Sequence, residues 1–318
     1  MKMKRTLSVL TVLAVSAALI LGLAACGGSG GSSSDSSENA SAEPNITENS
    51  GEQSETVPAT PAASTREYVL ENEVIVDDEN LLIRIDRVEE DSIFGPEVKI
   101  YCENRSDASV HVSQDQAVVN GYSVSTLWGE DIADGMNVTG TIDFVGLDAD
   151  KGLDVIDELQ LYLRAYPSDD WSADDLLNDV YTVYPTGLSA ESVNYPEPAL
   201  GSNPVTIDEN DQARFIIYGA NDDPIWGYTV LAYMENNTDD FVMFSWDDVS
   251  VNGSMCDPFW AKMLAPHTAG YAEISFLSSD FEENGIETVE NITFSLTVSN
   301  YSDWTAPDIL DGIYTYEP

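Results

Sequence analysis

From about residue 73 to the C-terminus, hydrophobic and polar residues alternate in short runs that polar turns separate. Val98, Ile100 and Cys102, for example, alternate with charged or polar neighbours. A period of two is typical of a strand that buries one face, whereas runs with a helical period are few. The pattern therefore predicts an all-β protein.

The alternating runs place seven strands in the first half of the chain. They cover residues 74–76, 82–88, 98–103, 110–119, 122–127, 138–145 and 156–166, with a turn or short helix over 148–154. Asn120-Gly121 separates two of these runs and suits a type I′ hairpin, because both central residues of that turn need a positive φ.

The second half repeats the first at a nearly constant offset. Asn104 recurs as Asn236 and Gly121 as Gly253, both 132 positions later, and Trp171 recurs as Trp304 after one inserted residue. We therefore expect repeat 1 at 68–186, a linker at 187–202 and repeat 2 at 203–318. About seven short strands per repeat predict two tandem immunoglobulin-like β-sandwich domains, although the Cys, Trp, Cys core spacing is missing.

The N-terminus reads as a targeting segment. Residues 1–25 combine a basic start with an apolar run, and Cys26 follows Leu-Ala-Ala, which resembles a bacterial lipobox whose cysteine receives a diacylglyceryl group. The alternative is an uncleaved transmembrane anchor, since the run approaches the roughly 20 residues that span a bilayer. Residues 26–67, rich in Gly, Ser and Glu, predict a disordered tether after the lipidated Cys26.

Charge excludes some partners. The chain has 12 Lys+Arg against 57 Asp+Glu, a net charge of −45. Nucleic-acid binding needs a basic surface and is not expected, and direct contact with anionic lipid or wall polymer is disfavoured. We expect the protein outside the cytoplasm, held on the outer face of the cell membrane by its lipid.

The repeat sorts the tryptophans. Trp128 corresponds to Trp260, Trp171 to Trp304 and Trp226 to Phe94, so these aromatic positions are interpreted as scaffold. Trp246 stands alone, opposite Gln114, in the apolar run 241–246. We expect Phe244 and Trp246 to form an exposed patch for a partner, or a contact between the two domains.

Acidic turns recur at equivalent places and are candidates for weak calcium binding. The residues are Asp77, Asp78 and Glu79 in repeat 1 and Asp208, Glu209 and Asp211 in repeat 2. The segment 148–159 begins like an EF-hand loop but has leucines at its sixth and twelfth places, so it fails that motif. Calcium is the only cofactor that the sequence suggests, and no specific metal site is assigned.

No nucleophile-plus-base motif, phosphate loop or zinc signature occurs, so an enzyme is not expected. A pair of carboxylates suited to glycoside hydrolysis stays open, because sequence spacing says nothing of their distance. Cys102 and Cys256 do not correspond to each other in the repeats, which favours two free thiols over a disulfide.

The chain resembles lipoproteins of Gram-positive bacteria that carry small Ig-like domains of unknown function. The resemblance rests on the lipobox, the tether and the repeated order of Glu-Asn, a polar turn, Asn-Gly and an apolar strand that ends at Phe144 or Phe276. Their fold is similar to that of secreted mycobacterial immunogenic antigens. The resemblance covers 68–318 and implies fold and location, and it carries no catalytic or binding residues.

Two functions remain open on the sequence. The first is a surface-displayed binding module for an unknown envelope protein or glycan, for which an exposed patch at Trp246 would speak. The second is a structural or accessory envelope protein, acting as a spacer or a complex subunit.

Overall fold

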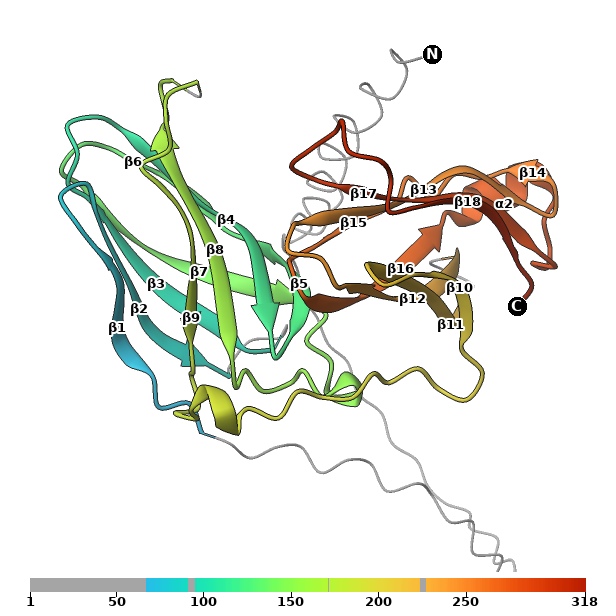
Figure 1. Cartoon of the computed structure of the whole chain (residues 1–318), viewed down its shortest axis with the longest axis horizontal. Helices are drawn as coiled ribbons and strands as arrows, with labels where there is room; N and C mark the ends of the chain where they lie inside the picture. Colours follow the sequence, from blue (N-terminus) through green and yellow to red (C-terminus); the bar gives the residue numbers. More distant parts are fainter. Residues whose placement is uncertain (1–66, 91–94, 171, 224–226) are drawn as a thin grey trace, which may run out of the picture. The chain divides into compact units, whose positions relative to one another are not determined.

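The computed structural model describes residues 67–90, 95–170, 172–223 and 227–318 (Figure 1). The predicted signal peptide, Cys26 and almost all of the predicted tether lie outside the described residues, as do Phe94, Trp171 and Trp226. Within the described ranges no helix has the length and apolar character needed to cross a membrane.

Nine strands make up the described part of repeat 1. They are β1 (Glu71–Asp77), β2 (Leu81–Glu89), β3 (Glu97–Asn104), β4 (Val110–Val119), β5 (Tyr122–Leu127), β6 (Gly129–Ile132), β7 (Asn137–Val145), β8 (Leu159–Pro167) and β9 (Leu177–Val183). A 3-10 helix, η2 (Ala149–Lys151), lies in the segment predicted as a turn or short helix.

Repeat 2 has nine strands in the same order. They are β10 (Val205–Glu209), β11 (Ala213–Asp223), β12 (Gly227–Asn236), β13 (Val242–Val251), β14 (Ser254–Met255), β15 (Ala261–Leu264), β16 (Thr268–Phe276), β17 (Ile292–Asn300) and β18 (Leu310–Tyr316). The α-helix α2 (Ser278–Asn284) lies between β16 and β17, and the 3-10 helix η3 (Ala190–Ser192) lies in the linker.

Each repeat is a two-sheet sandwich. In repeat 1, β1-β2-β3-β7 form one sheet and β6-β4-β8-β9 the other, while β5 pairs with both β4 and β7. In repeat 2, β10-β11-β12-β16 face β13-β17-β18, with β14 and β15 both paired to β13. The orders β2-β3-β7 and β4-β8-β9 are the A-B-E and C-F-G orders of an immunoglobulin sandwich, so the predicted fold class is confirmed.

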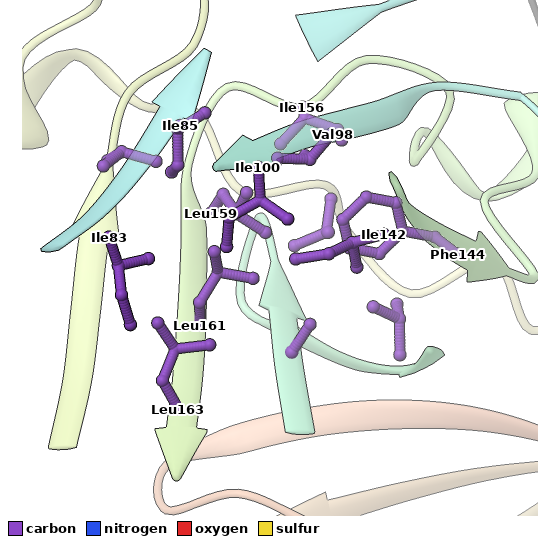
Figure 2. Close-up of a cluster of buried hydrophobic side chains, with 14 of the residues drawn as sticks. Ile83, Ile85, Val98, Ile100, Ile142, Phe144, Ile156, Leu159, Leu161 and Leu163 are labelled. Carbon is purple, nitrogen blue, oxygen red and sulfur yellow. The ribbon is translucent and has the colours of Figure 1, made fainter. Parts of the chain in front are cut away.

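The core of repeat 1 lies between its two sheets. Figure 2 shows Ile83, Ile100 and Phe144 from the first sheet facing Leu159 and Leu161 of β8, all fully or almost fully buried. Because alternate residues of these strands point inward, the period-two pattern of the sequence is the pattern of burial. Repeat 2 has a second core between its own sheets, and two of its residues, Ile216 and Tyr233, belong to the core of repeat 1. The exact domain boundaries stay a prediction.

The two asparagines that first indicated the repeat are buried hydrogen-bonding centres. The side-chain nitrogen of Asn104 donates to the carbonyls of Ala108 (2.7 Å) and Ile132 (2.9 Å), and its oxygen accepts from the backbone and hydroxyl of Ser106. Asn236 makes the equivalent bonds one repeat later. Both side chains are fully buried, so each amide secures a loop that would otherwise leave carbonyls unpaired.

The Asn-Gly hairpins have the predicted geometry. Asn120 and Gly121 have φ of 49° and 83°, and Asn252 and Gly253 have 52° and 85°. Both signs match the type I′ turn. The sequence-based prediction left out β6 and β9, and their counterparts β15 and β18. Three of the four residues of β6 are exposed, so that strand has no alternating signal.

Cys102 and Cys256 are free, buried thiols that belong to the cores of different repeats. The prediction of two free cysteines is therefore confirmed. Burial raises the pKa of Cys102 to about 12, so this thiol is a packing residue rather than a nucleophile.

Candidate functional site

The patch predicted at Phe244 and Trp246 is wrong, because both side chains point into the core of repeat 2. Phe244 is 0% exposed and Trp246 2%. The Trp246 ring stacks on Phe294 with centroids 3.9 Å apart, and Trp260 meets it edge-on at 5.9 Å. The apolar run that suggested an exposed face follows a strand whose residues 242, 244 and 246 alternate inward.

The acidic turn of repeat 1 is occupied by internal partners. Asp77 forms an ion pair with Arg105 at 2.7 Å, and the Asp78 carboxylate accepts the backbone N–H groups of Asn80 and Leu81 at 2.7 and 2.8 Å. Glu79 is exposed. The carboxylate of Asp78 therefore closes the turn between β1 and β2.

In the acidic turn of repeat 2 the amide oxygen of Asn210 takes the place of the Asp78 carboxylate and accepts the N–H groups of Gln212 and Ala213 at 2.8 and 3.0 Å. Asp208 accepts hydrogen bonds from the Tyr314 hydroxyl and the Glu209 backbone, and Glu209 pairs with Arg214 at 3.0 Å. Asp211 is exposed. No group of three His, Cys, Asp or Glu side chains suited to a metal occurs in the part of the chain that the structure describes. Calcium binding at these turns stays a prediction.

The tryptophans interpreted as scaffold divide into two kinds. Trp128 and Trp260 are partly buried against the cores of their repeats, as expected. Trp304 instead is 63% exposed, in the loop between β17 and β18, with its ring centroid 6.1 Å from that of Tyr301. This exposed pair was not predicted.

The two repeats meet where β5 lies beside β16, a region that we call the seam. Strand β5 of repeat 1 runs parallel to β16 of repeat 2 at Tyr122 and Ala269, and the Ala269 N–H donates to the carbonyl of Gly121 at 3.1 Å. The hydroxyls of Ser123 and Thr268 lie 2.8 Å apart and are buried. The Ser123 hydroxyl oxygen also accepts the Ala265 N–H at 2.9 Å.

Tyrosines fill one side of the seam. The rings of Tyr122 and Tyr271 stack with centroids 5.4 Å apart and planes 4° from parallel. Tyr218 and Tyr233 of repeat 2 contact Tyr271 at 5.9 and 5.4 Å. Buried Tyr233 packs with the core of repeat 1. The hydrophobic core of repeat 1 therefore extends across the seam into repeat 2.

The linker is bound to the same tyrosines. The Tyr122 hydroxyl donates to the carbonyl of Pro196 at 2.9 Å, and the Ala199 N–H donates to the Tyr271 hydroxyl at 2.8 Å. Tyr195 lies over Gly121 and donates its hydroxyl proton to Glu158 at 3.0 Å. Hence the seam fixes three segments together: β5, β16 and the linker.

Two lysines lie at the seam in a strongly acidic chain. Burial opposes the charge of Lys151, but its contact with Asp148 at 2.5 Å raises its pKa overall, and its amine lies over the Tyr271 ring at 5.0 Å. Burial, with a smaller contribution from Lys151, lowers the pKa of Lys262 to about 8. No carboxylate among the described residues lies within ion-pair distance of Lys262, and its amine is 3.5 Å from the Ser125 hydroxyl.

Comparison of the sequence with protein families and with curated proteins finds no match. Solved structures match weakly over most of the chain.

Three such structures illustrate the level of similarity. The YadV chaperone has a TM-score of 0.21 at 12% identity, with 74% of this chain and all of that chain covered. The Salmonella enterica SafA pilin in complex with the SafB chaperone gives 0.23 at 10%, with coverage of 78% and 100%. A glycosyl hydrolase family 2 member from Bacteroides cellulosilyticus gives 0.18 at 9%, with coverage of 74% and 29%. Similarity at this level carries no argument about function.

Proposed function

We propose that this protein is a structural envelope component, in which a lipid-anchored tether presents two immunoglobulin-like sandwiches as one rigid unit. The observation that carries the proposal is the seam, with its buried hydroxyl pair, stacked tyrosines and bound linker. Two domains that only need to be displayed are served by a flexible linker, whereas a spacer has to hold its length.

The inward position of Phe244 and Trp246 favours this proposal over the binding-module hypothesis. The exposed apolar patch was the feature that distinguished that hypothesis, and both side chains belong to the core. The lipobox-like segment ending at Cys26 and the low-complexity tether support the envelope location, on the sequence alone.

Rigidity is tested by a distance measurement between the repeats. Spin labels at Val180→Cys in repeat 1 and Ile313→Cys in repeat 2 occupy exposed positions, 40% and 78% accessible, while the native Cys102 and Cys256 are buried. We expect one narrow distance distribution in the full chain. Replacing Tyr271 by Ala removes the stack on Tyr122 and should broaden it. A broad distribution in the unaltered chain would contradict the rigid spacer.

Anchoring is tested separately. Cys26→Ser removes the thiol that lipidation needs, so the variant should leave the detergent-extracted membrane fraction and appear in the medium or soluble fraction. The matched control is Cys102→Ser, which alters a buried thiol of the folded unit and should stay with the membrane if it folds. Retention of the Cys26→Ser chain in the membrane would indicate an uncleaved hydrophobic anchor instead.

A second candidate function, glycan binding, is favoured by one observation, the exposed Trp304 beside Tyr301. An exposed aromatic face in a wall-facing protein provides a stacking surface for sugar rings. Soluble cell-wall glycan fragments should then quench tryptophan fluorescence, and Trp304→Ala should abolish the response. Phe259→Ala, which removes another exposed aromatic at 72% accessibility, is the control and should bind normally.

A further inference from the structure

The seam joins two different faces of a repeated fold. Repeat 1 contributes the start of β5, residues 120–123, which we call the hairpin face. Repeat 2 contributes the start of β16, residues 267–271, which we call the edge face. Because the two repeats share one strand order, each also has a version of the face that it does not use at the seam.

The unused hairpin face belongs to repeat 2. Ser254 and Met255 of β14 correspond to Tyr122 and Ser123, and β14 pairs only with β13 among the described strands. Met255 is 64% exposed, and nothing lies within 4 Å of a Cβ placed on Gly253. The hairpin that is covered in repeat 1 is therefore open in repeat 2.

The unused edge face belongs to repeat 1. Met136 and Asn137 correspond to Thr268 and Ala269, and Met136 is 60% exposed. Strand β7 pairs with β3 along residues 137–143, and β5 reaches its other edge only at residues 143–145. Within the described residues, the start of β7 thus keeps the unpaired edge that β16 uses at the seam.

Two exposed methionines stand where the seam has its buried hydroxyl pair. Ser123 and Thr268 contact each other at 2.8 Å, and their counterparts in the other repeat are Met255 and Met136. Met255 and Met136 lie on opposite repeats of one chain, so they meet as Ser123 and Thr268 do only if two chains associate. Methionine is a flexible apolar side chain that is frequent at binding surfaces.

We propose that copies of this chain associate head to tail, with the hairpin face of repeat 2 in one copy docked on the edge face of repeat 1 in the next. The contact copies the seam: Met255 packs on Met136, β14 runs parallel to the start of β7, and the Asn137 N–H donates to the Gly253 carbonyl. The contact joins two different faces. A dimer therefore keeps a free hairpin face at one end and a free edge face at the other, and the assembly grows as a linear array. The inference goes beyond the proposed spacer and does not depend on the anchor.

Charge sets the condition for association. Asp134 lies two residues before Met136 and Asp257 two residues after Met255, in a chain whose net charge is −45. Like charges repel across such a contact, and salt screens them, with a Debye length of about 10 Å at 0.1 M and about 3 Å at 1 M. Association should therefore strengthen as salt is added, which an attraction between opposite charges would not do.

Cysteine cross-linking of the full chain in its own membranes tests the proposal. A chain with Met136→Cys and Met255→Cys should give a ladder of disulfide-linked oligomers on oxidation. Co-expression of the two single variants should give dimers that grow no further, because each dimer then contains one competent contact. Ser123→Cys with Thr268→Cys calibrates the geometry, since its disulfide should form within one chain and leave the mass unchanged.

A chain with Val145→Cys and Leu277→Cys is the control for cross-links that form by random collision between chains. These two positions are equivalent in the repeats, lie away from both faces and are 57% and 60% accessible. We expect the Met136/Met255 pair to cross-link at least about tenfold more than this control, which corresponds to about 1.4 kcal/mol. Equal cross-linking of the two pairs, or monomers alone at both low and high salt, would overturn the proposal.

Discussion

The two Asn-Gly hairpins have the same internal chemistry in different surroundings. The amide of Asn120 donates to the Val155 carbonyl at 2.7 Å and accepts two backbone N–H groups, and Asn252 does the same with Thr288 as its acceptor. Yet Asn120 is 3% exposed, whereas Asn252 lies at the surface. The sequence of the hairpin sets its local shape, and the segments packed around it, Tyr68 and Thr186 of repeat 1 together with the seam, decide how much of it water reaches.

A second pair of equivalent positions differs in chemistry rather than in surroundings. Trp246 fills the core of repeat 2, and its counterpart in repeat 1 is Gln114, which is 6% exposed. Neither polar atom of the Gln114 side chain has a hydrogen-bond partner among the described residues. Burial without a partner costs free energy, and Gln114 buries two such polar atoms where Trp246 buries only its indole N–H, so this strand position is less favourable in repeat 1.

The largest expected effect is at Trp246. Trp246→Ala removes the stack on Phe294 and leaves a cavity that its aromatic neighbours fill only in part. The free energy of unfolding of repeat 2 should fall by about 3–5 kcal/mol, measured by chemical denaturation. Gln114→Ala in repeat 1 is the matched control and should change stability far less. A small loss for Trp246→Ala would restore the exposed-patch hypothesis.

Next comes the hairpin pair. Asn120→Ala leaves a buried carbonyl and two buried N–H groups unpaired and should cost about 3 kcal/mol, whereas Asn252→Ala exposes the same groups to water and should cost about 1 kcal/mol. Both positions have nearly the same positive φ, so backbone strain cancels from the comparison. Denaturation midpoints of the two variants measure the difference, and equal losses would show that the seam does not exclude water.

The third prediction concerns Lys262, whose counterpart Glu130 is exposed in repeat 1. Burial lowers the folded pKa of Lys262 to about 8 from 10.5, so below about pH 8 the amine is charged in both states and the cost of burying it is complete. Between about pH 8 and 10.5 the unfolded chain holds more protons at this site, and stability rises with pH.

Lys262→Met should therefore raise the free energy of unfolding on the order of 2 kcal/mol at pH 7. That advantage should shrink towards zero as the pH rises to about 10.5. Denaturation of both chains at pH 7 and pH 10 measures it. A gain of equal size at the two pH values would mean that the amine is not desolvated.

The smallest effect is a gain at Gln114. Gln114→Leu replaces an unpartnered buried amide by an apolar group of similar length, and repeat 1 should become more stable by about 1 kcal/mol. The shift of the thermal midpoint measures this change. The same substitution at Gln116, whose amide donates to the Met263 carbonyl at 3.1 Å across the seam, should instead destabilise the chain.

Most of the fold is local enough to be predicted from the sequence. Residues 98–103 alternate strictly and form β3, and the Asn-Gly pairs give turns of the expected sign. Strand β6 was not predicted, because three of its four residues are exposed and its sequence has no alternating pattern. Strands β9 and β18 lie at sheet edges with several exposed residues, so their patterns are weak as well.

The seam was not predictable in the same way. Tyr122 and Tyr271 stack only because β5 meets β16, a contact between segments some 150 residues apart that no periodicity encodes. The one available signal was asymmetry between the repeats: Ser123 opposite Met255, and Thr268 opposite Met136. The same comparison misled at Trp246, because a residue unique to one copy serves packing as readily as binding.

Because the Asn252-Gly253 hairpin is exposed, we expect it to be a site of spontaneous chemical modification. An asparagine followed by glycine is prone to spontaneous deamidation, since the glycine N–H can attack the side-chain amide carbon and release ammonia through a cyclic imide. Both amides are hydrogen-bonded, but the side chain of Asn120 is buried whereas that of Asn252 meets water, so we expect the rearrangement at Asn252. Hydrolysis of the imide adds a carboxylate beside Met255 and removes the donor to Thr288. A deamidated chain would then carry one more negative charge at the exposed hairpin of repeat 2 than an unmodified chain.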